Sequence, residues 1–69
     1  MSWNYRIVKL ADGGYAIHEV YYDKGGKPNS MTKDAITFGG DTPEEVSRQI
    51  EMAYNDAKKH PVFIPPDNW

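Results

Sequence analysis

One helix is marked at both ends within residues 38 to 60, FGGDTPEEVSRQIEMAYNDAKKHP. Thr42 is a good N-cap, Pro43 suits the first helical position because no N–H bond is needed there, and Glu45 completes a capping box. Positive charge lies in the last turn, at Lys58, Lys59 and His60, and Pro61 ends the helix. The chain of 69 residues is therefore built around a single helix.

Apolar residues recur along this helix at spacings of four, three and four, which places them in one narrow stripe. The stripe consists of Val46, Ile50, Ala53 and Ala57, with Tyr54 at its edge. We expect this stripe to be the one buried face of the helix.

Glycine pairs at 13–14, 25–26 and 39–40 each follow a stretch rich in aromatic and β-branched residues, a pattern typical of turns between strands. The sequence therefore predicts an antiparallel meander of three strands at residues 3–10, 15–22 and about 31–38. Residues 62–64 could add a short fourth strand. The predicted fold is α+β in the order β-β-β-α-β. We expect residues 1–64 to form a single domain and 65–69 a C-terminal tail.

The first turn carries the clearest hairpin signal, because Asp12-Gly13 readily supplies the positive φ values of a two-residue turn. That turn places Arg6 opposite Glu19, a favourable cross-strand charge pair. It also predicts the two faces of the sheet, which would combine Trp3, Tyr5 and Ile7 with Ala16, His18, Val20 and Tyr22, and Val8 and Leu10 with Tyr15, Ile17 and Tyr21. A three-residue loop would flip the second strand.

Composition limits the classes of function. The chain has no cysteine, which excludes disulfides and thiolate metal sites, and its two histidines are His18 and His60. No apolar run is long enough to span a membrane, and the first residues lack a signal-peptide pattern, so we expect a cytoplasmic protein. We predict no metal site and no cofactor.

No catalytic constellation is expected. His18 and Glu19 are adjacent in a strand and so point to opposite faces, and neither Ser30 nor Thr37 has a nucleophile elbow around it. The glycines at 39 and 40 precede the helix as in a phosphate cradle, but three carboxylates already lie at that end, so we interpret the segment as a cap. The sequence predicts a protein that is not an enzyme.

The aromatic side chains are more numerous than one small helix needs to cover: two Trp, five Tyr and two Phe. Tyr and Trp often anchor interfaces, although they also fill thin cores. The candidate interface residues are Trp3, Tyr15, Ile17, Tyr21 and Tyr22.

Two segments carry a resemblance to a known family. YRIVKLADGGYAIHEV, followed by a third strand and then GGDTPEEVSRQIEMAYNDA, resembles the N-terminal domain of HicB-like antitoxins. The resemblance implies a degraded ribonuclease-H-like β-β-β-α-β domain that binds a small toxin ribonuclease. The chain departs from the family by an insert at residues 23–30, and we expect no DNA-binding segment after Trp69. YAIHEVYYD and GDTPEE are also similar to segments of short bacterial proteins without an assigned activity.

Two hypotheses for the function follow from these patterns. The first is a non-enzymatic module whose sheet edge or aromatic sheet face binds a protein partner or a second copy of the chain. The alternative is binding of single-stranded nucleic acid through sheet aromatics and the loop containing Lys24, Lys27 and Lys33. The net charge of −2 argues against nucleic acid.

Overall fold

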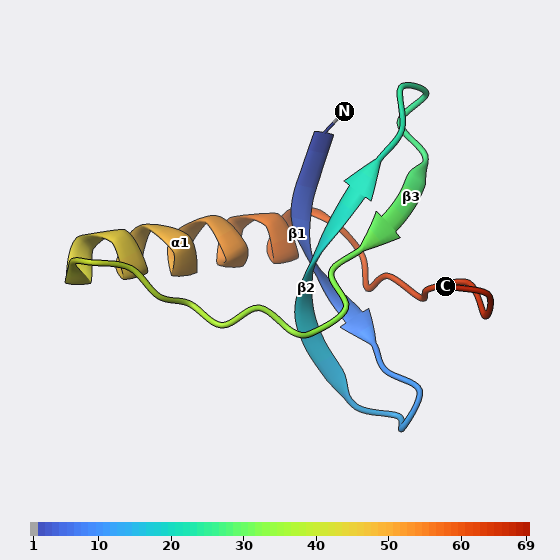
Figure 1. The fold of residues 1–69 in the computed structure, drawn as a ribbon, viewed down its shortest axis with the longest axis horizontal. Coiled ribbons are helices and arrows are strands. Elements are labelled where there is room, and N and C mark those ends of the chain that lie inside the picture. The colour runs from blue at the N-terminus through green and yellow to red at the C-terminus, as the bar shows by residue number, and fades with distance from the viewer. Residues whose placement is uncertain (1) are drawn as a thin grey trace.

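The computed structural model describes residues 2 to 69 as three strands followed by one helix (Figure 1). The strands are β1 (Ser2–Lys9), β2 (Tyr15–Tyr22) and β3 (Pro28–Met31), and the helix is α1 (Pro43–Lys59). The strands form one antiparallel sheet in the order β1-β2-β3. The predicted α+β fold class is therefore confirmed.

The helix and the C-terminal segment lie on opposite sides of the sheet (Figure 1). The C-terminal end of α1 lies beside β1, and its N-terminal half projects away from the sheet. Residues 32–42 lead back along the helix side to the start of α1. The molecule measures 37 × 31 × 21 Å. The helix and the segment before it lie on one side of the sheet, and the C-terminal segment lies on the other side (Figure 1).

The first hairpin closes with a three-residue loop, not with the predicted two-residue turn. Leu10 N donates to Gly14 O at 2.8 Å, and Gly13 N donates to Leu10 O at 3.0 Å. Gly13 has a φ of 93°, so it is the left-handed residue that follows a type I turn in such loops. The Asp12 carboxylate accepts from Gly14 N at 2.8 Å and holds the turn in place.

This loop shifts the register by one residue, so the predicted pairing of Arg6 with Glu19 is wrong. Arg6 faces His18, and Tyr5 faces Glu19. The predicted faces are corrected in the same way, because a one-residue shift moves every side chain of β2 to the other face. One face carries Trp3, Tyr5, Ile7, Tyr15, Ile17, Glu19 and Tyr21, and the other carries Asn4, Arg6, Val8, Ala16, His18, Val20 and Tyr22.

The first of these faces is the helix side and the second is the tail side. The Tyr5 ring lies 6.3 Å from the ring of Phe38, which belongs to the segment leading to α1. Arg6 contacts Pro61 on the opposite side, where the C-terminal segment runs.

The third strand begins earlier than predicted, because residues 23–30 form a hairpin turn and the start of β3. Asp23 N donates to Lys27 O at 2.9 Å and Gly26 N to Asp23 O at 3.0 Å, with a φ of 81° at Gly26. This is the same three-residue loop as in the first hairpin. β3 then starts at Pro28, a residue that the first position of an edge strand tolerates.

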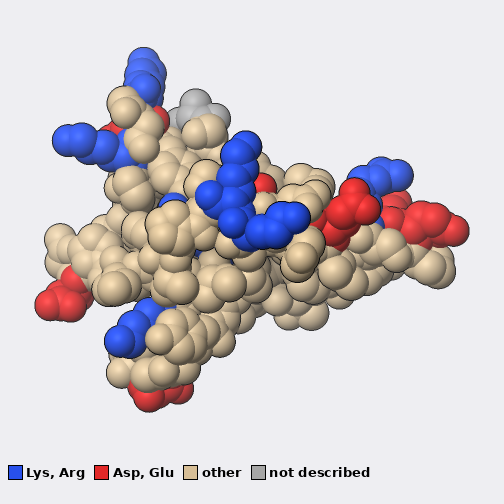
Figure 2. Space-filling model, turned by 180° about the vertical axis from the view of Figure 1, so that it is seen from behind, with Lys and Arg blue, Asp and Glu red and all other residues tan. Residues whose placement is uncertain are grey.

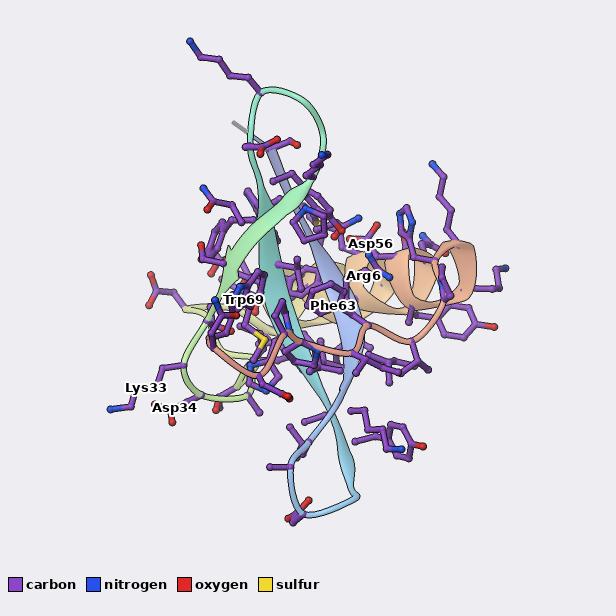
Figure 3. All side chains as sticks on the ribbon, turned by 90° about the vertical axis from the view of Figure 1, so that its right-hand side faces the viewer. Arg6, Lys33, Asp34, Asp56, Phe63 and Trp69 are labelled. Atoms are coloured by element: carbon purple, nitrogen blue, oxygen red, sulfur yellow. The ribbon has the colours of Figure 1, made fainter. Side chains whose placement is uncertain are left out.

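Most of the predicted third strand, residues 31–38, leaves regular pairing after Met31. Thr32 N still donates to Glu19 O at 3.0 Å, and Ile36 N donates to Ile17 O at 2.8 Å. The four residue steps from Thr32 to Ile36 therefore lie beside only two steps of β2, from Glu19 to Ile17. The extra residues make the chain bend outward at Lys33 and Asp34, whose side chains extend from the edge of the molecule in Figure 3.

The helix begins and ends as predicted. Thr42 Oγ1 accepts from Glu45 N at 3.3 Å, and Glu45 Oε2 accepts from Asp41 N at 2.8 Å, so the reciprocal bond of the capping box reaches one residue before the cap. α1 ends at Lys59, and His60 N donates to Asp56 O at 3.1 Å.

The expected buried stripe of α1 is buried only in part. Ala53 is buried, whereas Ile50 and Tyr54 are 50% and 63% exposed. The reason is that only one end of α1 lies against β1. Gln49 binds the backbone of Gly39 through both of its amide atoms, so the loop before the helix covers a different side of α1.

Arg6 ties the end of the helix to the sheet from a position that is only 9% exposed. Its Nε and Nη2 atoms donate to Pro61 O at 3.2 and 2.8 Å, and Nη1 donates to the Tyr22 hydroxyl at 2.8 Å. The Phe63 ring centroid lies 5.4 Å from the guanidinium carbon. The planar fork therefore fixes the path of the chain just after α1.

The outer edge of β1 is closed by residues that come after it in the chain. The Asp56 carboxylate accepts from Tyr5 N at 3.0 Å. Phe63 N donates to Ile7 O at 2.8 Å, and Lys9 N donates to Phe63 O at 3.0 Å. In the described part of the chain, the predicted fourth strand is thus reduced to a single parallel bridge between Val8 and Phe63.

We predict that Arg6→Lys lowers the free energy of unfolding by about 2 kcal/mol or more, because an ammonium group cannot reproduce the fork and hydrogen bonds to buried charged groups contribute about 1.5–3 kcal/mol each. Urea unfolding followed by circular dichroism measures the change. Arg48→Lys, on the exposed surface of α1, is the matched control and should change stability by less than about 0.5 kcal/mol. Equal effects of the two substitutions would contradict this account of Arg6.

Candidate interaction surfaces

Four of the five predicted interface residues lie on the helix-side face of the sheet. Trp3 and Tyr21 face each other near one end of the hairpin, and Tyr15 and Ile17 lie toward the other end. Trp3 packs edge-on against Tyr5 with ring centroids 5.1 Å apart. Because Phe38 and Tyr5 occupy the middle of this face, its exposed aromatic residues are separated into two ends.

The fifth residue, Tyr22, lies on the tail-side face. Its hydroxyl accepts from Arg6 Nη1 and donates to Asn4 Oδ1, both at 2.8 Å. Tyr22 therefore serves the internal polar network around Arg6, and the structure does not bring it together with the other four.

Tyr21 is bound to a carboxylate on its own strand. The Tyr21 hydroxyl donates to Glu19 Oε1 at 2.9 Å. This hydrogen bond, followed by burial and the negative charge of Glu19, raises the pKa of Tyr21 above its ordinary value of 10.0. Burial, with the charges of Glu19 and Asp56, also raises the pKa of Tyr5. The helix-side face thus carries a carboxylate among its aromatic residues, which disfavours phosphate groups there.

The three lysines of the nucleic-acid alternative do not form one patch. Lys24 lies in the loop between β2 and β3, and Lys27 directly precedes β3. Lys33 follows the other end of β3 and points outward next to Asp34 (Figure 3). In Figure 2 the Lys and Arg side chains of the visible face stand in several separate groups, with Asp and Glu between them.

His18 is 3% exposed and is held by the segment after β3. Its Nδ1 lies 3.0 Å from Thr32 O and 3.2 Å from Thr32 Oγ1. Glu19 points to the opposite face, where it binds Tyr21. Within residues 2–69, no three His, Asp or Glu side chains are grouped closely enough to hold a metal ion.

The segment before the helix has the structure of a cap. The amides of Asp41 and Glu45 are bound by the side chains of Glu45 and Thr42, and the amide of Gly39 donates to Gln49 Oε1 at 3.3 Å. These donors are therefore already occupied by the protein itself.

The sequence analysis did not identify two exposed apolar surfaces. The first, which we call the helix flank, consists of Ile50 and Tyr54 on α1. The Lys58 ammonium lies 5.3 Å from the centre of the Tyr54 ring. Sequence periodicity marks these apolar residues, but it assigns them to the core because it does not show how much of the helix meets the sheet.

The second surface, which we call the tail groove, is a hollow of about 440 Å³ where the C-terminal segment passes the ends of β1 and β3. Its walls include Val8, Leu10, Met31, Ile64, Pro65 and Trp69. Trp69 packs on Phe63 with ring centroids 5.5 Å apart, and its backbone N donates to Pro66 O at 3.2 Å (Figure 3). The C-terminal tryptophan is thus anchored on the fold.

No protein-family model, curated protein or solved structure matches the chain.

In residues 2–69, the single helix falls short of the length and apolar character needed to cross a bilayer.

We predict that the free energy of unfolding falls as the pH rises above about 10. Folding raises the pKa of Tyr5 and Tyr21, so the folded chain holds these protons more tightly than the unfolded chain does. The two protonated tyrosines contribute their full stabilisation at pH values below the ordinary tyrosine pKa. This stabilisation is lost as the pH rises through their raised pKa. Urea unfolding at a series of alkaline pH values measures the slope. Glu19→Gln should flatten it, and an unchanged slope in that variant would contradict the assigned cause.

Proposed function

We propose that this chain is a small protein-interaction module without catalytic activity of its own. The observation that carries the proposal is its surface area. The structure exposes 5195 Å², whereas a compact monomer of 7.9 kDa exposes about 4,400 Å². The surplus of about 800 Å² is close to what one partner contributes to a protein–protein interface of standard size.

The chemistry of the exposed surface supports a protein as the partner. Large apolar side chains are exposed on the helix flank, in the tail groove and at the ends of the sheet. By contrast, the buried apolar residues of the described chain are Tyr5, Val8, Val20 and Ala53. Exposed apolar patches of this kind mark interaction sites in soluble proteins.

The mode of binding follows from the edges of the sheet. The outer edge of β1 is closed by Asp56 and Phe63, and β3 is a four-residue edge strand that begins with Pro28. Short edges with proline resist pairing with another strand. The partner therefore binds side chains of the helix flank, the tail groove or the ends of the sheet, and does not extend the sheet.

The resemblance to HicB-like antitoxin domains supports the same class of function. Three antiparallel strands followed by a helix are compatible with the fold that the resemblance implies. In that family the domain binds a small toxin ribonuclease, so neutralisation of such a toxin is one form that the proposed binding takes.

Single-stranded nucleic acid has less support as a ligand. Lys27 and Lys33 lie at the two ends of β3, on the order of 15–20 Å apart at the rise of an extended strand. Glu19 lies among the sheet aromatics, and the net charge is −2. Both features oppose the electrostatic attraction on which such binding depends.

Photo-crosslinking in cells of the source organism tests the proposal. A photoreactive phenylalanine analogue replaces one exposed apolar residue at a time, namely Tyr15, Tyr54 or Ile64. Asp12 and Asn29 are matched controls, since both are exposed and polar. We expect at least one apolar position to give a specific protein adduct, with itself or with another protein, that neither control gives. If all five positions give the same background, the chain is not a protein-interaction module.

A further inference from the structure

We propose that the helix flank is the seam of a homodimer in which the α1 helices of two copies pack antiparallel. This inference rests on the proposed function and names its partner as a second copy of the chain. Ile50 and Tyr54 form the centre of the seam, with Glu44 of each copy beside Lys58 of the other.

The position of the flank on α1 leaves it open. Each residue advances about 100° around a helix, which places Ile50 and Tyr54 about 60° and about 100° from Ala53 on one side. Gln49 and Glu45 lie about 40° and about 80° from Ala53 on the other side. The loop at residues 39–41 binds Gln49 and Glu45 and so lies on that other side, along the first turns of α1. Ile50 and Tyr54 are 50% and 63% exposed.

The helix offers a flank of useful length. At about 1.5 Å per residue, its 17 residues span about 25 Å. The N-terminal half of α1 projects beyond the sheet, so this half of the flank is clear of the strands (Figure 1). Ile50 and Tyr54 are one turn apart, so in an antiparallel pair the Ile50 side chain of one copy fits beside the Tyr54 ring of the other.

The charges at the two ends of the flank are self-complementary. Glu44, Glu51 and Lys58 follow one another at seven-residue spacing, on the solvent side of Tyr54. A two-fold axis at the level of Glu51 brings Glu44 of one copy level with Lys58 of the other, twice over, and the two Glu51 side chains are then the one like-charged pair of this set. A parallel pair would instead oppose Glu44 with Glu44 and Lys58 with Lys58. The charge order therefore favours the antiparallel arrangement.

Area allows a seam of standard size. The surplus of about 800 Å² belongs to the whole chain, and it equals what each half of such an interface buries. Two-fold interfaces use the same patch on both subunits, and a patch that is acidic at one end and basic at the other meets this requirement without a second protein.

Sedimentation equilibrium over a dilution series from micromolar to millimolar tests the seam. We expect a monomer–dimer equilibrium whose dissociation constant rises at least tenfold in Tyr54→Glu, because the substitution places a charge in the apolar centre. Met52→Glu is the matched control. Met52 is exposed to a similar degree and lies about 100° from Ala53 on the opposite side of the same helix, so its dissociation constant should stay within about threefold of wild type.

A charge swap tests the antiparallel arrangement. Lys58→Glu alone places four acidic groups in two opposing pairs, and Glu44→Lys alone places four basic groups there, so each variant should dimerise more weakly than wild type. An equimolar mixture of the two should form heterodimers about as tight as the wild-type dimer, because every pair then joins opposite charges. Circular dichroism of each variant confirms that α1 is intact.

The outcomes separate this inference from the proposed function. A chain that stays monomeric at millimolar concentration overturns the dimer, as does a dimer weakened equally by Tyr54→Glu and Met52→Glu. A mixture of the charge variants that stays as weak as either alone overturns the antiparallel seam. In each of these cases a crosslink to another protein would still support the interaction module, whereas the absence of any crosslink would contradict both.

Discussion

The buried guanidinium of Arg6 is the interaction on which most of the structure depends. Its partners are a carbonyl, a hydroxyl and an aromatic ring, with no carboxylate among them, so its positive charge is stabilised by geometry more than by an opposite charge. Pro61 O accepts two of its N–H groups at the point where the chain leaves α1 and passes to the other side of the sheet (Figure 1). This path brings Phe63 alongside β1, which closes the edge of the sheet.

The same constraint explains why the helix is so little covered. Arg6 holds the C-terminal end of α1 near β1, and Asp56 adds a second attachment to Tyr5 N. Toward its N-terminus the attachments of the helix within residues 2–69 are to its own preceding loop, through Gln49 and Glu45. Because the amphipathic helix packs on the sheet at one end, some of its apolar side chains stay exposed. These side chains form the helix flank.

The sequence was informative where local chemistry decides the structure. Thr42 and Pro61 predict both helix ends correctly, because capping and proline act within one turn. The predicted register of the first hairpin was wrong because Asp12-Gly13 suits both a two-residue and a three-residue loop. Which loop forms depends on Gly14 and the Asp12 side chain together. The exposure of the helix flank was not predicted because it depends on a long-range contact. The spacing of Ile50 and Tyr54 marks an apolar stripe. How much of that stripe is buried depends on the contact between Arg6 and Pro61, which are far apart in the chain. The predicted interface at Tyr15, Ile17, Tyr21 and Trp3 stays a prediction.

The separation of Arg6 and Pro61 by 55 residues has a consequence for biosynthesis. The two hairpins use only local turns and can form while the chain is still being made. Arg6 gains its carbonyl acceptor only after the ribosome has synthesised the whole helix and the residues that follow it. Until then the outer edge of β1 is open and the tail-side face is bare, a combination prone to strand pairing between nascent chains. Docking of residues 61–63 is therefore also the step that covers the open edge of β1.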